Sequence, residues 1–232
     1  MTTHTPAQAA ETAAVTPATT ATGRGTPWTR AAALTGVVFV IGIVGGFVVG
    51  GGPPQAGASA AKVSHYYSTN QGRVGGGALL TSLSVVSGVG FAMYLRTYLR
   101  SFVPEWMTSL FFTGVVIFGI SGAVSAGVAF ALTDHPKSLS PDAAQALNNL
   151  QQNFSWAPLA IGLTLTYTAV ALMIRSAGRL PAWLGWTSWL MAALALSFFL
   201  AFIPLLLTAV FALITSIRLA QRNPDPTGVI RL

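Results

Sequence analysis

The chain has 232 residues, of which 53% are hydrophobic and only 7% are charged, and its formal net charge is +7 at pH 7. Soluble domains carry about 25% charged residues, so this chain lacks the polar surface that would keep it dissolved in water. Its basic residues lie at the ends of apolar runs, which argues against nucleic-acid binding and for orientation in a membrane. The absence of cysteine excludes disulfides, iron–sulfur clusters and thiol catalysis.

The apolar runs predict an all-α fold, a polytopic bundle of six transmembrane helices. Residues 1–27 are mostly Thr, Ala, Pro and Gly, which predicts a disordered tail because they bury too little apolar surface to offset their ordering entropy. The six-helix domain covers 28–220, and a second polar tail covers 221–232. The expected spans are 31–51, 74–95, 106–132, 156–174, 182–201 and 204–219, with long loops at 52–73 and 133–155.

The first span carries Gly42, Gly46 and Gly50 at four-residue spacing, which places a smooth groove on one helix face. This face predicts close packing within the same bundle, with a homo-oligomer as the alternative. Arg24 and the small residues at 58–60 flank the span, so a cleaved signal peptide is also considered. Because the apolar region is about 20 residues long, against 7–15 in a signal peptide, we expect a retained span.

Two groups of polar residues are candidate binding features. A cluster closes the first long loop, and it consists of His65, Tyr66, Tyr67, Asn70 and Arg73. It fits an interfacial anchor, and the alternative is a lipid-headgroup or small-ligand site in which Arg73 contacts an anionic group. A stripe of hydroxyls in the second and fourth spans predicts either packing hydrogen bonds or a solute path. The stripe consists of Ser84, Ser87, Thr164 and Tyr167.

The second long loop contains a predicted amphipathic helix. Ser140-Pro141-Asp142 is typical of a helix cap and first turn. One face of the following segment is apolar and the other carries uncharged amides, which is typical of a helix on a membrane surface or across the bundle mouth. The apolar face is Ala143, Ala146, Leu147, Leu150 and Phe154, and the amide face is Gln145, Asn148, Asn149 and Gln152. We expect the amides to face water, with a polar ligand as the alternative.

The segment 180–217 contains no charged residue and is too long for one span. It predicts a hairpin of two spans that turns near 202–204, so that six spans place both termini on one side. That side receives Arg24, Arg30, Arg96, Arg100, Arg175, Arg179, Arg218, Arg222 and Arg231, whereas the other receives Lys62, Arg73 and Lys137. The positive-inside rule therefore predicts cytoplasmic termini and external long loops.

No Asp, Glu, Lys, Arg or His lies within a predicted span. Charges at membrane depth mark proton relays and ion paths, so their absence argues against a proton-coupled transporter, a pump or an intramembrane protease. His65 and His135 are isolated histidines on different loops. We expect no catalytic group, metal or cofactor, with a haem held between these two histidines as the alternative.

The segment Leu180-Pro181-Ala182-Trp183-Leu184-Gly185-Trp186, together with Tyr66-Tyr67-x-x-Asn70-x-x-Arg73, resembles a group of uncharacterised six-helix membrane proteins common in high-GC bacteria. The resemblance covers about residues 30–220. It implies the six-helix fold and a plasma-membrane location, and it implies no activity.

These observations favour a non-enzymatic accessory or scaffold protein that binds lipid or a protein partner. The alternative is a facilitative carrier or efflux component for an apolar or amphiphilic small molecule. Hydroxyls that line one cavity would favour the carrier, whereas hydroxyls that bond within helix pairs would favour the scaffold. The lipid bilayer is the expected partner, with a protein partner or homo-oligomer through small-residue faces, and no nucleic acid.

Overall fold

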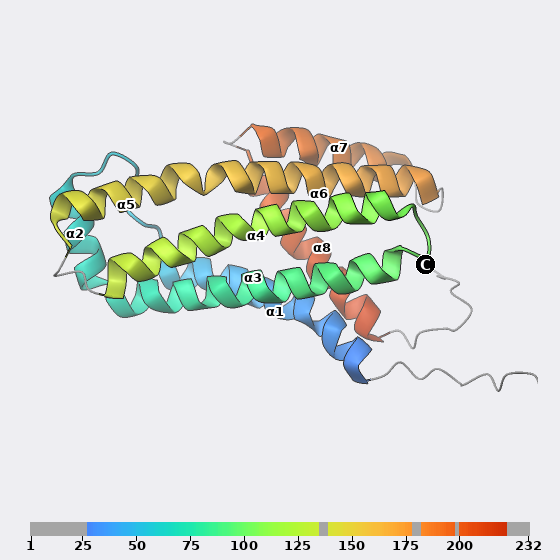
Figure 1. The fold of residues 1–232 in the computed structure, drawn as a ribbon, viewed down its shortest axis with the longest axis horizontal. Coiled ribbons are helices and arrows are strands. Elements are labelled where there is room, and N and C mark those ends of the chain that lie inside the picture. Colours follow the sequence, from blue (N-terminus) through green and yellow to red (C-terminus); the bar gives the residue numbers. More distant parts are fainter. Residues whose placement is uncertain (1–26, 135–138, 178–181, 198–199, 222–232) are drawn as a thin grey trace, which may run out of the picture.

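The computed structural model describes residues 27–134, 139–177, 182–197 and 200–221, and every regular element in this part is a helix (Figure 1). The helices are α1 Pro27–Gly50, α2 Ala60–Thr69, α3 Gln71–Leu99, α4 Glu105–Asp134, α5 Pro141–Phe154, α6 Trp156–Ala177, α7 Ala182–Leu196 and α8 Phe202–Gln221. The all-α prediction is confirmed. Both predicted tails lie almost entirely outside the described residues.

Five helical segments are long and apolar enough to cross a bilayer, which makes the chain a multi-pass membrane protein. They are Arg30–Gly50, Gln71–Leu99, Glu105–Asp134, Pro141–Ala177 and Phe202–Gln221. The helix expected as the fifth span, α7, has only 15 residues, whereas a crossing takes about 20. It ends at Leu196, and the predicted turn at 202–204 is instead the first turn of α8, where Pro204 is tolerated because the first amides of a helix have no partner within it.

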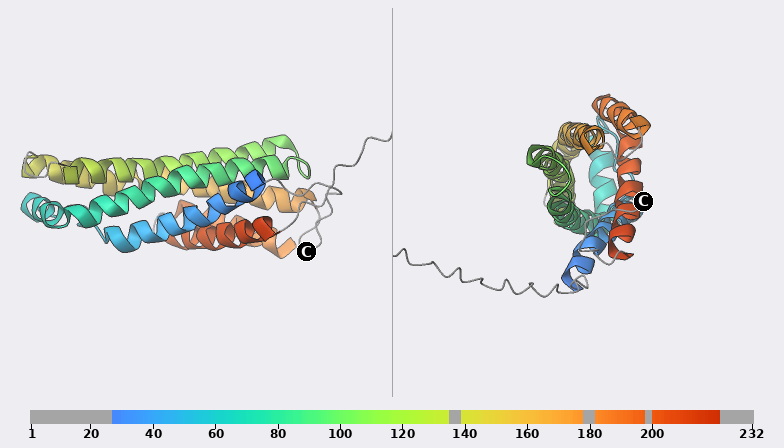
Figure 2. Two further views of the ribbon diagram at one scale, coloured as in Figure 1. Left: turned by 90° about the horizontal axis from the view of Figure 1, so that it is seen from below. Right: turned by 90° about the vertical axis from the view of Figure 1, so that its right-hand side faces the viewer.

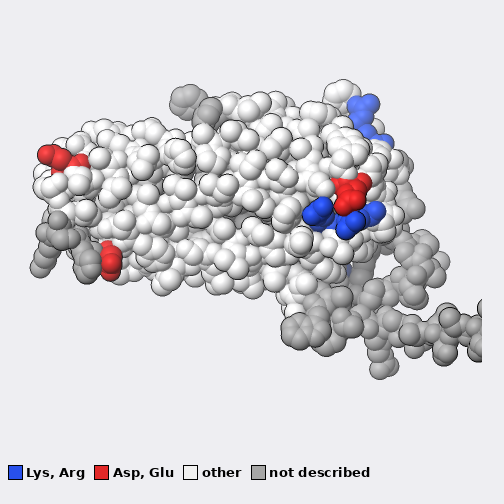
Figure 3. Space-filling view, viewed as in Figure 1, with Lys and Arg blue, Asp and Glu red and all other residues white. Residues whose placement is uncertain are grey.

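The long helices form a ring when the bundle is viewed along its axis (Figure 2). Around this ring α1 packs on α3, α3 on α4, α4 on α6, α6 on α7, and α8 lies between α7 and α1. The loop 51–59, α2 and α5 lie together at one end, which we name the cap (Figure 1). The opposite end, named the arginine end, holds Arg96, Arg100, Arg175 and Arg218. Charged residues on the visible face gather at these two ends, with an uncharged surface between them (Figure 3).

The first long loop is not irregular throughout, because α2 lies within it. Ser59 caps this helix by accepting a hydrogen bond from the amide of Lys62. In the second long loop α5 confirms the predicted helix, with Ser140 accepting from the amide of Ala143 at the predicted cap. The segment formed by α5 and α6 has 37 residues, about 55 Å of helix, and exceeds the hydrocarbon thickness of about 30 Å. This segment therefore extends beyond the hydrocarbon region at one end or both.

Large exposed apolar side chains form a band around the middle of the bundle. They run from Leu79 to Met93 on α3 and from Trp106 to Ile120 on α4. Within the described residues, none occurs over 50–78 or 121–149. The exposed apolar band is the surface that lipid chains would cover, and on α3 and α4 it ends before the cap.

The amide face of α5 points into the protein, so the expectation that it faces water was wrong. Asn148 is 0% exposed, whereas Leu150 and Phe154 on the apolar face are 49% and 51% exposed. The amide of Asn148 donates to the carbonyl of Pro54 at 3.1 Å, and that of Gln145 donates to the carbonyl of Ala58 at 2.7 Å. The loop 51–59 is not helical, so its carbonyls need outside donors, and the α5 amides supply them.

The small-residue face of α1 packs inside the bundle, as predicted. A side-chain Cβ at Gly46 would lie 2.6 Å from the hydroxyl of Thr81, and one at Gly77 would lie 2.5 Å from the Cα of Gly50. Gly42 lies in the same way against the α3 backbone at Leu80. This face is therefore occupied by α3 and is not free to hold a second copy of the chain.

Candidate functional site

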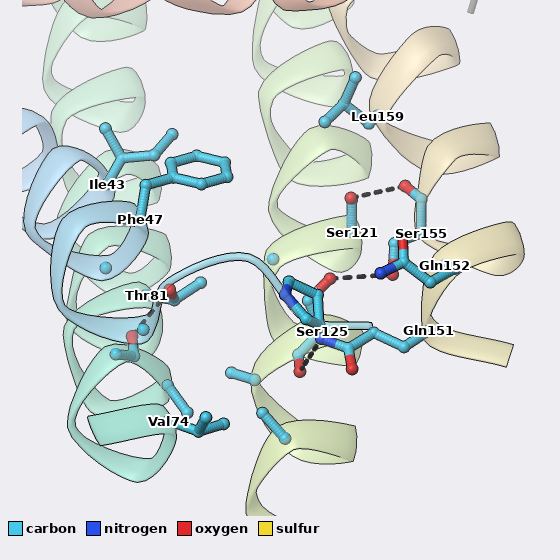
Figure 4. A pocket seen from close by; sticks show the side chains of 18 of the residues that line it. Ile43, Phe47, Val74, Thr81, Ser121, Ser125, Gln151, Gln152, Ser155 and Leu159 are labelled. Carbon is cyan, nitrogen blue, oxygen red and sulfur yellow. Dashed lines mark hydrogen bonds between the residues drawn. The ribbon is translucent and has the colours of Figure 1, made fainter. Parts of the chain in front are cut away.

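A cavity of about 370 Å³ lies inside the ring, directly beneath the cap (Figure 4). Its walls come from α1, α3, α4, α6 and the start of α8, and its roof comes from α2, α5 and the loop 51–59. The apolar wall includes Ile43, Phe47, Phe118, Leu159 and Leu205, and the polar lining includes Tyr66, Tyr67, Thr81, Ser121, Ser125, Gln151, Gln152 and Ser155. Helices far apart in sequence thus enclose one chamber with an apolar body and a polar end.

The cavity is closed toward the arginine end. The rings of Phe39 on α1 and Phe118 on α4 pack edge to face, with centroids 6.3 Å apart. Below them an apolar core fills the ring, and it includes Phe91, Leu95, Phe111 and Met173. The chamber therefore ends inside the bundle and does not pass through it.

The polar end is organised around Ser155, which precedes α6. The hydroxyl of Ser121 donates to the carbonyl of Ser155 at 2.6 Å, and that of Ser125 donates to the Ser155 hydroxyl at 2.8 Å. Ser121 and Ser125 lie four residues apart on α4, so they share one helix face. Gln151 donates to the carbonyl of Ser125 at 3.3 Å. These bonds hold α4 to the junction of α5 and α6 and leave the hydroxyl lone pairs available to a ligand.

Tyr67 forms the buried part of the roof. Its hydroxyl donates to the side-chain oxygens of Asn148 at 3.1 Å and Gln151 at 3.4 Å. Burial, with a smaller contribution from neighbouring Tyr66, raises the pKa of Tyr67 above its ordinary value of 10.0. The phenol of Tyr67 is therefore neutral at physiological pH.

One side of the cavity opens toward the exposed apolar band. Phe47, Trp156 and Phe202 line the cavity and are still 59%, 38% and 49% exposed. They come from α1, α6 and α8, and α1 packs on α3 and α8 rather than on α6. The opening is therefore lateral, bounded by α1, α6 and the start of α8, and it faces the region that lipid chains would occupy.

The predicted cluster of the first long loop is divided by the fold. Tyr66 and Tyr67 line the cavity, whereas His65 and Arg73 are exposed and lie outside its lining. Arg73 donates from Nε to the carbonyl of Val49 at 2.9 Å, where a cation stabilises the negative end of α1. Asn70 donates to the carbonyl of Tyr66 at 2.9 Å and closes α2.

The predicted hydroxyl stripe makes packing bonds and does not line the cavity. Ser84 donates to the carbonyl of Phe39 on α1 at 2.9 Å, and Tyr167 donates to that of Pro204 on α8 at 2.8 Å. Ser87 and Thr164 donate to carbonyls four residues earlier in their own helices. These four hydroxyls therefore bond within or between helices, whereas Thr81, another hydroxyl of the second predicted span, lines the cavity.

The chemistry of the cavity is that of a neutral binding site. None of the described lining residues carries a formal charge at neutral pH. In the described part of the chain no group of three or more His, Asp or Glu side chains could hold a metal ion, and His135 lies outside that part. The lining offers apolar contact and hydrogen bonds to whatever enters.

No family model matches the sequence, and neither curated proteins nor solved structures give a match. The resemblance to a six-helix group in high-GC bacteria therefore stays an expectation.

Proposed function

We propose that this protein is a non-enzymatic accessory component of the membrane that holds one amphiphilic lipid molecule in the cavity beneath its cap. The observation that carries this proposal is a chamber with an apolar body, a polar end and a side opening onto the lipid-facing band. Small-molecule sites are typically apolar with a few placed polar groups, and about 370 Å³ falls in their range of roughly 300–1,000 Å³.

A binding role fits better than a carrier role. A carrier needs a site that becomes accessible from each side in turn. Here the packed rings of Phe39 and Phe118 and the core beneath them separate the cavity from the arginine end. A carrier would have to open this core during every cycle, whereas a lipid-binding accessory protein uses the cavity as it is.

The cap lies on the external side of the plasma membrane in this proposal. The described cap and the adjoining start of α3 carry Lys62 and Arg73, whereas the arginine end has more basic residues close to apolar helices. Positive-inside bias then places the arginine end in the cytoplasm. With α7 and α8 counted as two spans, the fold has six spans and both termini are cytoplasmic.

The test is to fill the cavity with one side chain. Leu159 lines it, whereas Ile161 on the same helix is exposed on the outer surface of the bundle. Leu159→Trp should lower the amount of co-purified amphiphile by about tenfold or more, equivalent to about 1.4 kcal/mol of binding free energy. Ile161→Trp adds the same ring facing lipid and should leave binding unchanged.

Native mass spectrometry of the full chain, gently extracted from its own membrane, provides the measurement. The expected wild-type spectrum shows one bound amphiphile per chain. Equal retention by wild type and Leu159→Trp would refute the cavity as the binding site. Faster movement of a fluorescent lipid across proteoliposomes than across empty liposomes would instead favour the carrier.

A further inference from the structure

We propose that the ligand is a single-chain lipid with an uncharged, hydrogen-bonding head, such as a monoacylglycerol, and that its head lies under the cap. This inference rests on the proposed function and specifies the ligand class of the same site. It differs from the sequence-based hypothesis in which Arg73 receives an anionic group.

The lining selects against charge. A charged head that leaves water needs a countercharge, and the described lining supplies none. Arg73 lies beside the lining residue Gly51, but its side chain is exposed, lies outside the lining and donates to the carbonyl of Val49 at 2.9 Å. A phosphate or carboxylate would therefore lose its hydration without gaining an ionic partner within the lining.

The polar end matches a head that both donates and accepts hydrogen bonds. Ser155 accepts from Ser125 and, among the described residues, has no acceptor for its own hydrogen. Gln152 donates to the carbonyl of Pro54 at 3.3 Å, which leaves its side-chain oxygen and a second amide hydrogen for a ligand. Hydroxyl and ester groups satisfy both kinds of partner without a charge.

The position of the polar end matches the depth of a lipid head. From Trp106 to Ser125 along α4 is about 28 Å of helix, close to the hydrocarbon thickness of about 30 Å. The polar end therefore lies at the edge of the hydrocarbon, and the apolar body lies within it. When a lipid enters between α1 and α6, its head group therefore lies at nearly the same depth in the cavity as in the bilayer.

The size and closure of the cavity favour a lipid with a single acyl chain. The volume of about 370 Å³ is near the lower limit for small-molecule sites, and the floor at Phe39 and Phe118 prevents extension toward the arginine end. The end of one acyl chain can extend out of the cavity through the side opening past Trp156. A second acyl chain would need the same narrow opening.

The experiment titrates the delipidated full chain, in detergent, with three probes that share an oleoyl chain. Monooleoylglycerol is the uncharged single-chain probe, lysophosphatidylglycerol is the anionic one, and dioleoylglycerol has two chains. Native mass spectrometry should show one bound monooleoylglycerol, preferred at least about tenfold over each of the others because the lining offers no countercharge and little volume.

A pair of charge variants tests the head position. Gln152→Lys keeps a donor for Pro54 but places a cation in the lining, so the preference for monooleoylglycerol over lysophosphatidylglycerol should fall by about tenfold. Gln145→Lys places the same charge elsewhere on α5, where Gln145 bonds Ala58 outside the lining, and should not alter the preference.

The outcomes separate this inference from the proposed function. Wild-type binding of lysophosphatidylglycerol as tight as that of monooleoylglycerol, and lost in Leu159→Trp, would overturn the uncharged head and leave the binding function standing. Equal binding of dioleoylglycerol would overturn the single chain. Binding of no probe, with Leu159→Trp indistinguishable from wild type, would overturn both proposals.

Discussion

The hydroxyl of Tyr67 lies between two side-chain amides in the roof of the cavity, and its surroundings set its acid–base behaviour. Since burial raises the pKa of Tyr67, the folded chain binds this proton more tightly than the unfolded chain does. The stability that depends on the neutral phenol is therefore fully present below about pH 10 and is lost as the pH rises through the folded pKa.

Tyr67→Phe should lower the melting temperature at neutral pH, because the oxygens of Asn148 and Gln151 lose a buried donor, at a cost of about 1–3 kcal/mol. The same variant should lose less stability than wild type between about pH 9 and pH 11. Thermal unfolding in detergent measures both effects, and Tyr98→Phe, which removes a phenol from the arginine end, is the control. Equal alkaline destabilisation of wild type and Tyr67→Phe would contradict this account.

At the residue scale, features that depend on local sequence patterns could be predicted, whereas hydrogen-bond partners far apart in sequence could not. The spacing of Gly42, Gly46 and Gly50 was sufficient to predict close packing. The orientation of the α5 amides was predicted wrongly because their partners lie far away in sequence, with Asn148 and Pro54 separated by 94 positions. The four-residue spacing of Ser121 and Ser125 indicates that they share one helix face, but nothing in the sequence placed Ser155 beside them.

At the scale of elements, the contact between α4 and α6 depends on the absence of a side chain, as the contact between α1 and α3 does. A Cβ at Gly162 on α6 would lie 2.4 Å from the backbone nitrogen of Phe118 on α4. Backbone cannot move aside as a flexible side chain can, so α4 and α6 would have to separate. Gly127 on α4 is the natural comparison, since a Cβ there would have no neighbour within 4 Å.

Gly162→Ala should destabilise the protein by about 1–3 kcal/mol, the usual cost of overpacking. Gly127→Ala should be neutral or stabilising by up to about 1 kcal/mol, because alanine favours helix more than glycine does. The difference in melting temperature between these two variants is the measurement. A melting temperature for Gly162→Ala equal to that of wild type would show that the α4–α6 contact is looser than described.

Long helices were predictable because each carries its own apolar signal, and α5 was predictable from its cap and its two-faced pattern, whereas α2 was not. The segment that forms α2 was expected to be loop because only Val63 and Tyr67 are buried on its ten residues. Its cap at Ser59 was the local signal. The extent of α7 was overestimated because the charge-free run gives no boundary between two adjoining apolar helices.

At the scale of the whole molecule, the all-helical membrane fold followed from composition, but the cavity did not. A chamber depends on which helices are neighbours, and apolar periodicity does not encode the order of helices around a ring. The closed floor and the side opening likewise arise from contacts among α1, α4, α6 and α8 that only the tertiary structure brings together.

The proposed orientation can be tested by cysteine labelling, because the natural chain has no cysteine to interfere. His65→Cys in the cap should react with a membrane-impermeant maleimide on intact cells, whereas Ser101→Cys at the arginine end should react only after permeabilisation. Both positions are exposed in the structure, so accessibility within the protein is matched. The opposite labelling pattern would reverse the orientation and place the cavity in the other leaflet.

The loop 51–59 is held over the cavity by neutral amides, with Gln145, Asn148 and Gln152 all donating to its carbonyls. Screening by salt weakens ion pairs but has little effect on bonds between uncharged groups, and these amides do not titrate. These three bonds to the loop are therefore insensitive to the ionic strength and acidity of the medium that bathes the cap. These three bonds should hold the loop over the cavity equally well in dilute and in saline surroundings.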